Sequence, residues 1–271
     1  MDKNDAQFIG SIPDYYDRGL GPVLFSDFAA DMAGRAAELA PKRVLETAAG
    51  TGIVSRALRD RLPADARLTV TDLNPPMLEI ARRKFTADEL VEVQMADAQA
   101  LPFADAAFDA MVCQFGIMFY PDKPKSYREA LRVLRPGGTY LFSVWDAHRH
   151  NGFARITDGL IRQFFPVDPP GFYRVPFSCS EIDPIKEALL EAGFAGLSID
   201  VLRIDKQVSE LKPFAEGLIL GNPLVDQIRA RGGVAPEELV AAVVEALGRE
   251  FGTSPASIPL HTITYAARRA A

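Results

Sequence analysis

The sequence predicts an α/β protein built on a doubly wound, seven-stranded sheet that is mostly parallel, with an antiparallel last strand and helical cap insertions. Two observations support this prediction. Short β-branched or apolar runs alternate with segments of helical periodicity through residues 41–148, which is typical of a parallel sheet covered by helices on both faces. Further on, two long alternating runs flank the helical residues 209–257, as expected for an interrupted antiparallel hairpin.

The predicted strands share β-branched or alternating apolar residues and cover 43–47, 67–72, 91–95, 108–115, 139–145, 197–208 and 259–268. Helical spacing of apolar residues predicts helices over 24–40, 54–62, 75–84, 123–134, 153–165, 180–192 and parts of 210–252. Ser180 is the expected N-cap of its helix. Pro136-Gly137-Gly138 is expected to form the turn into the fifth strand, and residues 166–178 a proline-rich loop.

Composition narrows the class of protein. A chain of 271 residues suits one large domain, or one domain with an added cap. Its net charge of -6 argues against a nucleic acid as main partner. Cys113 and Cys179 have neither disulfide nor metal-ligand spacing, so no metal site is predicted. We find no signal pattern and no apolar run of membrane-spanning length, and expect a soluble, cytoplasmic protein without a membrane partner.

The chain is organised around residues 44–52, where an apolar run ends in Ala48-Ala49-Gly50-Thr51-Gly52 and a helical pattern follows. Glycine permits a sharp turn and a close backbone approach to a ligand, and the free N–H groups of a helix start favour an anionic group. Asp72, Asp97 and Gln114 also fall at or just beyond predicted strand ends. Ligands bind at that edge of parallel sheets, so the pattern predicts a site for a nucleoside-bearing cofactor.

Two cofactors fit this pattern. A dinucleotide requires G-x-G-x-x-G, in which the third glycine packs helix against strand. Here Gly50-x-Gly52-x-x-Ser55 is a poor match. S-adenosylmethionine instead carries a carboxylate, a ribose diol and an adenine but no phosphate. An NAD-dependent oxidoreductase and a non-catalytic cofactor-binding protein of the same fold stay open as alternatives.

The ordered motifs resemble those of class I S-adenosylmethionine-dependent methyltransferases. They are Val44–Gly52, Thr71-Asp72, Ala96-Asp97-Ala98, Leu101-Pro102-Phe103 with Phe108-Asp109, and Leu134-Arg135-Pro136-Gly137-Gly138. The resemblance is strongest to the branch that includes quinone-biosynthesis C-methyltransferases, and it covers about residues 12–146 and the last strand. It implies a Rossmann-like methyltransferase fold, with S-adenosylmethionine as methyl donor and S-adenosylhomocysteine as product.

The resemblance also implies residue roles. Gly50 and Gly52 would let the backbone approach the methionine portion, and Asp72 would accept hydrogen bonds from both ribose hydroxyls. Glu46 would face the ammonium group; it and Ala48 stand where the family usually has aspartate and glycine. The other implied contacts are Tyr16 with the carboxylate, Leu73 and Met77 with the adenine, Asp97 and the Ala98 N–H with the adenine edge, and Gln114 and Phe115 between cofactor and acceptor.

Methyl transfer from a sulfonium mainly requires alignment and exclusion of water. A general base is needed only if the acceptor loses a proton, and His148, His150 and Asp146 are weak candidates for it. Aromatic residues within 153–177 suggest a pocket for a small, apolar or aromatic acceptor.

We divide the chain into a helical segment closing over the cofactor (1–40), a cofactor-binding core (41–148) and a remainder (149–271). The remainder completes the sheet at about 193–208 and 258–269, and it carries cap insertions at about 150–180 and 209–257. The chain is a possible homodimer.

Overall fold

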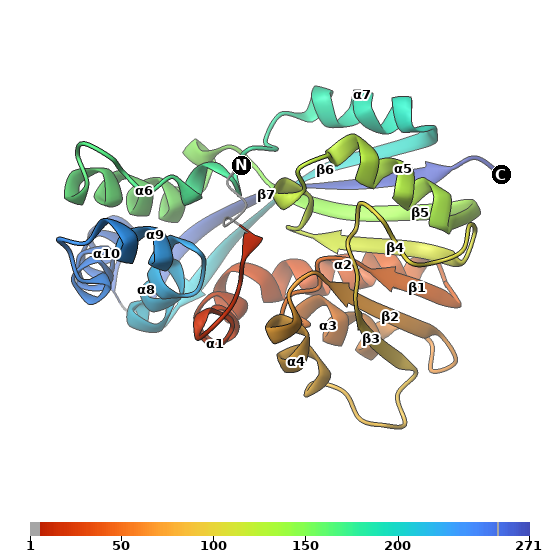
Figure 1. Cartoon of the computed structure of the whole chain (residues 1–271), viewed down its shortest axis with the longest axis horizontal. Helices are drawn as coiled ribbons and strands as arrows, with labels where there is room; N and C mark the ends of the chain where they lie inside the picture. Colours follow the sequence, from red (N-terminus) through yellow and green to blue (C-terminus); the bar gives the residue numbers. More distant parts are fainter. Residues whose placement is uncertain (1–5, 254) are drawn as a thin grey trace.

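A computed structural model describes residues 6–253 and 255–271 of the chain. Seven strands form one sheet in the order β3-β2-β1-β4-β5-β7-β6 (Figure 1). Their bounds are β1 (Arg43–Glu46), β2 (Arg67–Asp72), β3 (Val91–Met95), β4 (Phe108–Gln114), β5 (Leu134–Trp145), β6 (Phe194–Val208) and β7 (Ala256–Arg269). Strands β1 to β5 pair in parallel, whereas β7 is antiparallel to both β5 and β6. The predicted fold class is therefore confirmed.

Helices follow the strands in the predicted alternation. The longer ones are α2 (Ser26–Glu38), α3 (Ile53–Arg61), α4 (Pro75–Arg82), α5 (Lys123–Val133), α6 (Gly152–Phe164), α7 (Ile182–Ala192), α8 (Leu211–Leu220), α9 (Leu224–Arg231) and α10 (Pro236–Phe251). Shorter or irregular ones are α1 (Ile12–Tyr15), η2 (Tyr16–Phe25), η3 (Ile117–Phe119), η4 (His148–His150) and η5 (Phe172–Arg174). Proline is the first residue of α4 and α10 and the second of α5, positions where its missing N–H leaves no helical bond unmade.

Alternating side chains build a separate apolar core on each face of the sheet. Val44, Val112 and Leu141 contribute to one core, together with apolar residues of α2 and α3. Leu45 and Met111, their chain neighbours, belong to the other, which includes residues of α5 and α7. Strand β4 is buried along its whole length, as a central strand covered by helices on both sides must be.

The first long helix, α2, begins at Ser26, close to the predicted start at 24, and the ten-residue π-helix η2, which contains Pro22, precedes it. Two local predictions were wrong. Glu181 rather than Ser180 is the N-cap residue of α7, and no side chain caps it. Pro136-Gly137-Gly138 lies inside β5, where a bulge shifts the register between Phe108 and Ala110 of β4. Gly137 has φ +76°, so the glycine-rich segment bends the strand without ending it.

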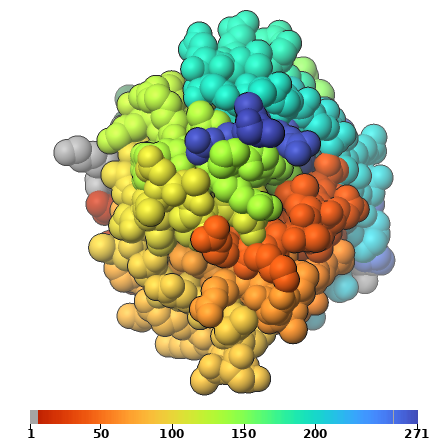
Figure 2. Space-filling view, turned by 90° about the vertical axis from the view of Figure 1, so that its right-hand side faces the viewer, coloured from red at the N-terminus to blue at the C-terminus, as the bar shows by residue number. Residues whose placement is uncertain are grey.

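Helices α6, α8, α9 and α10 gather beyond the carboxyl ends of the parallel strands (Figure 1). The long β6 and β7 run out toward them, and η2 crosses α8 closely. A Cβ on Gly19 would lie 2.9 Å from the Gly217 Cα, so glycine at this crossing lets the two backbones touch. The opposite side of the molecule shows the C-terminal residues below α7 (Figure 2). Among the described helices none has the length and hydropathy needed to span a bilayer.

Candidate cofactor and acceptor site

The glycine turn after β1 has the backbone that its sequence predicts. Gly50 and Gly52 have φ of +56° and +79°, a left-handed region that costs other L-residues about 1–2 kcal/mol. A Cβ on Gly52 would lie 2.8 Å from the Ala81 Cβ of α4, so this glycine is needed for space as well. Ala48 also has a left-handed φ, +51°. The backbone conformation is therefore kept although alanine stands where the resembled family has glycine.

Asp72 ties this turn to the end of β2. Its Oδ2 accepts the Gly50 N–H at 2.8 Å, and its Oδ1 accepts the Asn74 N–H at 2.8 Å and the Asn74 amide at 3.1 Å. Burial raises the pKa of this carboxyl, and the hydrogen bonds from Asn74 and Gly50 oppose that rise. A carboxylate has about four acceptor positions, so Asp72 keeps acceptor capacity for a ligand hydroxyl.

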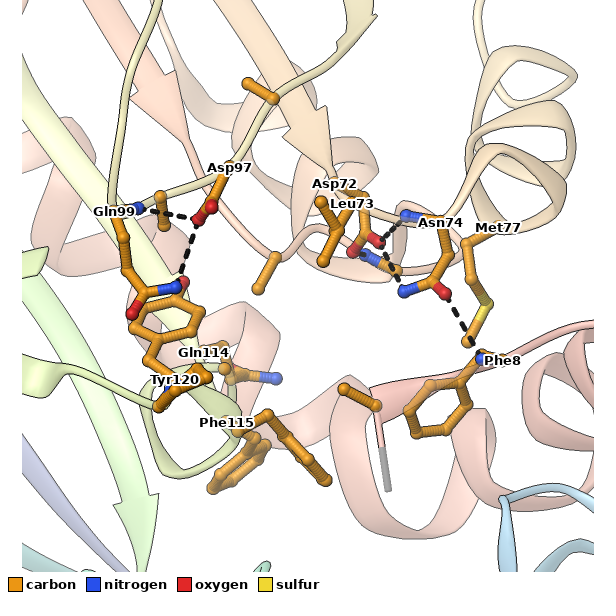
Figure 3. A pocket seen from close by; sticks show the side chains of 18 of the residues that line it. Phe8, Asp72, Leu73, Asn74, Met77, Asp97, Gln99, Gln114, Phe115 and Tyr120 are labelled. Carbon is orange, nitrogen blue, oxygen red and sulfur yellow. Dashed lines mark hydrogen bonds between the residues drawn. The ribbon is translucent and has the colours of Figure 1, made fainter. Parts of the chain in front are cut away.

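A cavity opens between Asp72, Asp97 and Phe115 at the carboxyl edge of the sheet (Figure 3). Ten residues implied by the resemblance line it: Tyr16, Ala48, Gly50, Asp72, Leu73, Met77, Asp97, Ala98, Gln114 and Phe115. Leu73 is 56% exposed there, so a planar ligand group would cover an apolar side chain that water now contacts. Asp97 Oδ1 accepts the Gln99 N–H at 2.8 Å. Gly52 shapes the turn without lining the cavity.

Several lining residues were not predicted. Phe8, Asn74, Gln99, Phe119 and Tyr120 belong to this group. Phe8 donates its backbone N–H to the Asn74 Oδ1 at 3.2 Å and packs edge-on against Tyr16 and Phe119, so it covers one wall of the cavity (Figure 3). Phe8 lies in a polar N-terminal segment without a motif, and no sequence signal indicates it. Asn74 could have been inferred as the residue before the prolines that begin α4.

Glu46 lies behind this cavity rather than in its lining. It borders a smaller cavity whose walls include Tyr16, Ala48, Gln114 and Phe115, all of which also line the larger one. Glu46 is 1% exposed, and its Oε2 has no hydrogen-bond partner among the described residues. Burial raises its pKa to about 8, opposed by the Ser55 hydroxyl and assisted by the charge of Asp72.

Gln114 and Phe115 end β4 at the boundary of these cavities. The Gln114 amide donates to the Phe25 carbonyl at 3.2 Å, whereas its buried Oε1 is unpartnered within the described chain. Phe115 has φ +54°, a strained conformation for a bulky residue. Its ring stacks on that of Trp145, with the ring centroids 4.2 Å apart.

A second cavity lies on the far side of Phe115. Its walls are largely aromatic: Phe8, Tyr16, Leu20, Leu24, Phe25, Phe115, Phe119, Trp145, Phe153, Phe172, Tyr173, Pro176, Phe177, Leu218 and Asn222. Four of the six aromatic residues singled out within 153–177 line it, whereas Phe164 and Phe165 do not. Tyr173 donates its hydroxyl to the Leu218 carbonyl at 3.1 Å. Among the described residues that line this cavity there is no Lys, Arg, His, Asp or Glu.

The three proposed general bases lie outside the lining of both cavities. His150 Nδ1 is 2.7 Å from the Asp146 Oδ2, so these two residues bind each other. His148 packs edge-on against Phe177 at 5.0 Å, and burial lowers its pKa. Their assignment as catalytic bases gains no support from the geometry.

Known proteins resemble the part of the chain that builds this site. Residues 45–142 match a family model described as a methyltransferase domain. Demethylmenaquinone methyltransferase of Thermus thermophilus is 47% identical over 118 residues, which cover 41% of this chain and 53% of that protein. The ubiquinone/menaquinone biosynthesis C-methyltransferase UbiE of Geotalea daltonii is 34% identical over 128 residues, covering 46% of this chain and 54% of that protein. The chain thus spans about half the length of these relatives.

A solved structure extends the likeness to the whole fold. Phosphoethanolamine N-methyltransferase 2 of Haemonchus contortus, in complex with S-adenosyl-L-methionine, superposes with a TM-score of 0.55 over 97% of this chain and 61% of that one, at 17% identity. At that identity the likeness concerns the fold alone, whereas the sequence match concerns the cofactor half. Residues 45–142 therefore match a methyltransferase domain, and the whole chain shares the fold of a methyltransferase solved with S-adenosyl-L-methionine.

Proposed function

We propose that this protein transfers a methyl group from S-adenosylmethionine to a small, apolar aromatic acceptor. One observation supports this proposal above the others: two cavities of contrasting chemistry meet at Phe115. The first has carboxylates of Asp72 and Asp97 at strand ends and an exposed apolar Leu73 between them. The second is lined almost entirely by aromatic and aliphatic side chains. A nucleoside suits the first and a hydrophobic acceptor the second.

The residues of the first cavity fit the cofactor. Asp72 retains acceptor capacity for a ribose diol, and Leu73 and Met77 offer apolar contact to an adenine. In the smaller cavity behind it, the Glu46 Oε2 and the Gln114 Oε1 are buried acceptors without a hydrogen-bond partner among the described residues, and leaving such atoms unpaired costs about 1–3 kcal/mol each. The cofactor's ammonium group would supply the missing donors. When bound, the cofactor supplies an electrophilic methyl group on a sulfonium with a neutral leaving group.

The chain's own contribution is to position the acceptor and exclude water. Phe115, Phe119 and Tyr16 line both cavities, so they would define the passage through which the acceptor meets the methyl carbon. Aromatic walls desolvate the nucleophile and fix its orientation, which is the main requirement of an in-line displacement. The ionisable groups in the acceptor lining are Tyr16 and Tyr173, whose pKa values burial raises far above neutral.

None of the described residues that line the acceptor cavity could therefore act as a general base near neutral pH. This favours acceptors that attack the methyl group without prior deprotonation by the protein, such as an electron-rich aromatic carbon whose ring proton passes to solvent after the transfer. Quinone-type precursors have this chemistry, and the curated relatives named above act on such compounds. The proposal covers the class of acceptor and not one compound.

Methyl transfer can be measured directly. The protein is incubated with methyl-labelled S-adenosylmethionine and a panel of hydroquinones, naphthols and phenols with and without charged substituents. We expect labelled product from neutral aromatic members and weaker transfer to anionic ones. Phe177→Ala should reduce that turnover, whereas Leu190→Ala, which changes an exposed residue of α7 outside both linings, should not. Enhanced NADH fluorescence without S-adenosylhomocysteine binding would instead support the oxidoreductase alternative.

A further inference from the structure

Asp146, His150 and His261 form a cluster that neither cavity uses. The Asp146 Oδ2 lies 2.7 Å from the His150 Nδ1 and 3.8 Å from the His261 Nδ1, and one ligand atom from each residue falls within 4.8 Å of the other two. We propose that these three side chains bind a divalent transition-metal ion, with zinc as the best-suited ion. Two imidazoles and a carboxylate are a common protein ligand set for such ions.

A buried asparagine holds the cluster together. Asn151 is fully buried; its amide donates to the Asp146 and His261 carbonyls, each at 3.1 Å, and its Oδ1 accepts the His261 N–H at 3.0 Å. The Asp146 N–H also donates to the His261 carbonyl at 3.0 Å. The main chains of two ligands, more than a hundred residues apart in sequence, are therefore fixed by one clamp. Such support is what a metal site needs behind its ligands.

The ligand atoms are close to coordination spacing. Zinc–nitrogen and zinc–oxygen bonds of about 2.0–2.2 Å in a tetrahedron place ligand atoms about 3.4 Å apart. The shorter present separation is a hydrogen bond, and it would open as the ion enters. His150 is on the three-residue turn η4 with its side chain 37% exposed, whereas the side chains of Asp146 and His261 are 14% and 20% exposed. The more exposed His150 therefore faces two more buried side chains, and an exposed side of the site remains for water.

The surrounding charges set the affinity. Asp146 Oδ1 is occupied by the Ala147 N–H at 2.6 Å, which leaves Oδ2 for the ion. Arg149 donates to the His150 Nε2 at 2.9 Å; it must turn away when His150 binds through Nδ1, and it is exposed enough to do so. Arg203, opposite His261 in the β6–β7 pair, is balanced by Asp205 at 3.3 Å. We expect a micromolar rather than a nanomolar site.

The site joins three parts of the chain next to the acceptor cavity. It bridges the end of β5, η4 and β7, and α6 begins directly after η4. Phe153, in the first turn of α6, lines the acceptor cavity. An ion bound here would fix the start of α6 and with it one wall of that cavity. The metal binding itself does not depend on whether the protein transfers a methyl group.

Zinc titration of chelator-treated protein by isothermal calorimetry tests the proposal. We expect one saturable site per chain, with affinity lowered by about tenfold or more in His261→Gln and in His150→Gln. His148→Gln is the matched control, because His148 is the third histidine of the sequence and stands outside the cluster; it should bind as the wild type does. Cobalt should give a visible absorption band that His148→Gln keeps and His261→Gln loses.

Circular dichroism melts establish that each variant is folded. If His261→Gln in β7 fails to fold, His150→Gln on the exposed turn provides the same test. Absence of saturable zinc binding to the folded wild-type protein would overturn the proposal. Equal affinities in the wild type and in folded His150→Gln would also overturn it, because the ion would then be bound elsewhere.

Discussion

Phe115 stacks on Trp145 with ring planes 2° apart and centroids 4.2 Å apart. Phe115 lines both cavities, whereas Trp145 lines only the acceptor side. The pair therefore forms the partition between a polar site built at strand ends and an aromatic site covered by the cap. Their places in neighbouring strands bring the rings together, since Phe115 directly follows β4 and Trp145 is the last residue of β5.

The acceptor cavity should be observable through Trp145, the single tryptophan of the chain. A neutral aromatic compound that enters the cavity should quench or shift its fluorescence, because it would contact the indole. Phe177→Ala removes one acceptor wall and should weaken that response. Leu73→Ala should leave it unchanged but lower the affinity for S-adenosylhomocysteine by about threefold to tenfold, given the apolar area that Leu73 offers.

These two variants are suitable partners because neither residue is fully buried and each lines only one cavity. The assignment of the two cavities would be reversed if Leu73→Ala lowered the affinity for the aromatic compound and Phe177→Ala lowered the affinity for S-adenosylhomocysteine.

The glycine turn should be intolerant of a methyl group. Gly52→Ala would place a Cβ at φ +79° and 2.8 Å from the Ala81 Cβ, so we expect a loss of at least about 1–2 kcal/mol in unfolding free energy. Gly159→Ala is the control, because Gly159 lies within α6 and an added Cβ would meet no described atom within 4 Å apart from the adjacent backbone of its own helix. It should raise stability by about 0.5–1 kcal/mol. Urea unfolding of both variants measures the contrast, and equal stabilities would mean that the turn is not constrained.

The buried Glu46 should make stability depend on pH. Its pKa rises from 4.5 to about 8 on folding, so the folded state retains a proton that the unfolded state releases. The resulting stabilisation is complete below pH 4.5 and is lost as pH rises through 8. At about 1.4 kcal/mol per pKa unit, it amounts to several kcal/mol.

Glu46→Gln removes this titration while keeping the shape of the neutral carboxyl. The variant and the wild type should therefore have similar melting temperatures near pH 5, and the variant should become the more stable of the two as pH approaches 9. Parallel melting curves across that range would show that Glu46 does not carry the raised pKa.

Most of the fold and of the cofactor cavity could be predicted from sequence, for local reasons. Strands such as β2 carry β-branched residues between prolines or glycines, and Asp72 and Asp97 follow strand ends that parallel topology brings together. Residues 11–24 indicated only a loop or a short helix, because Gly19, Gly21 and Pro22 are typical of loops, and the ten-residue η2 packs against α8, far away in sequence. The Asp146–His150–His261 cluster was missed because β7 returns beside β5 only after the cap, a pairing that no local spacing indicates.

Calorimetric titration with S-adenosylhomocysteine tests the central claim most directly. We predict one site of micromolar affinity, weakened about tenfold to a hundredfold in Asp72→Asn, because a hydrogen bond to a charged group contributes about 1.5–3 kcal/mol. Asp65→Asn is the matched control, because Asp65 precedes the first residue of β2, whereas Asp72 is its last residue, and the Asp65 side chain is 64% exposed. No binding at tens of micromolar, or equal affinity in folded Asp72→Asn, would contradict the account.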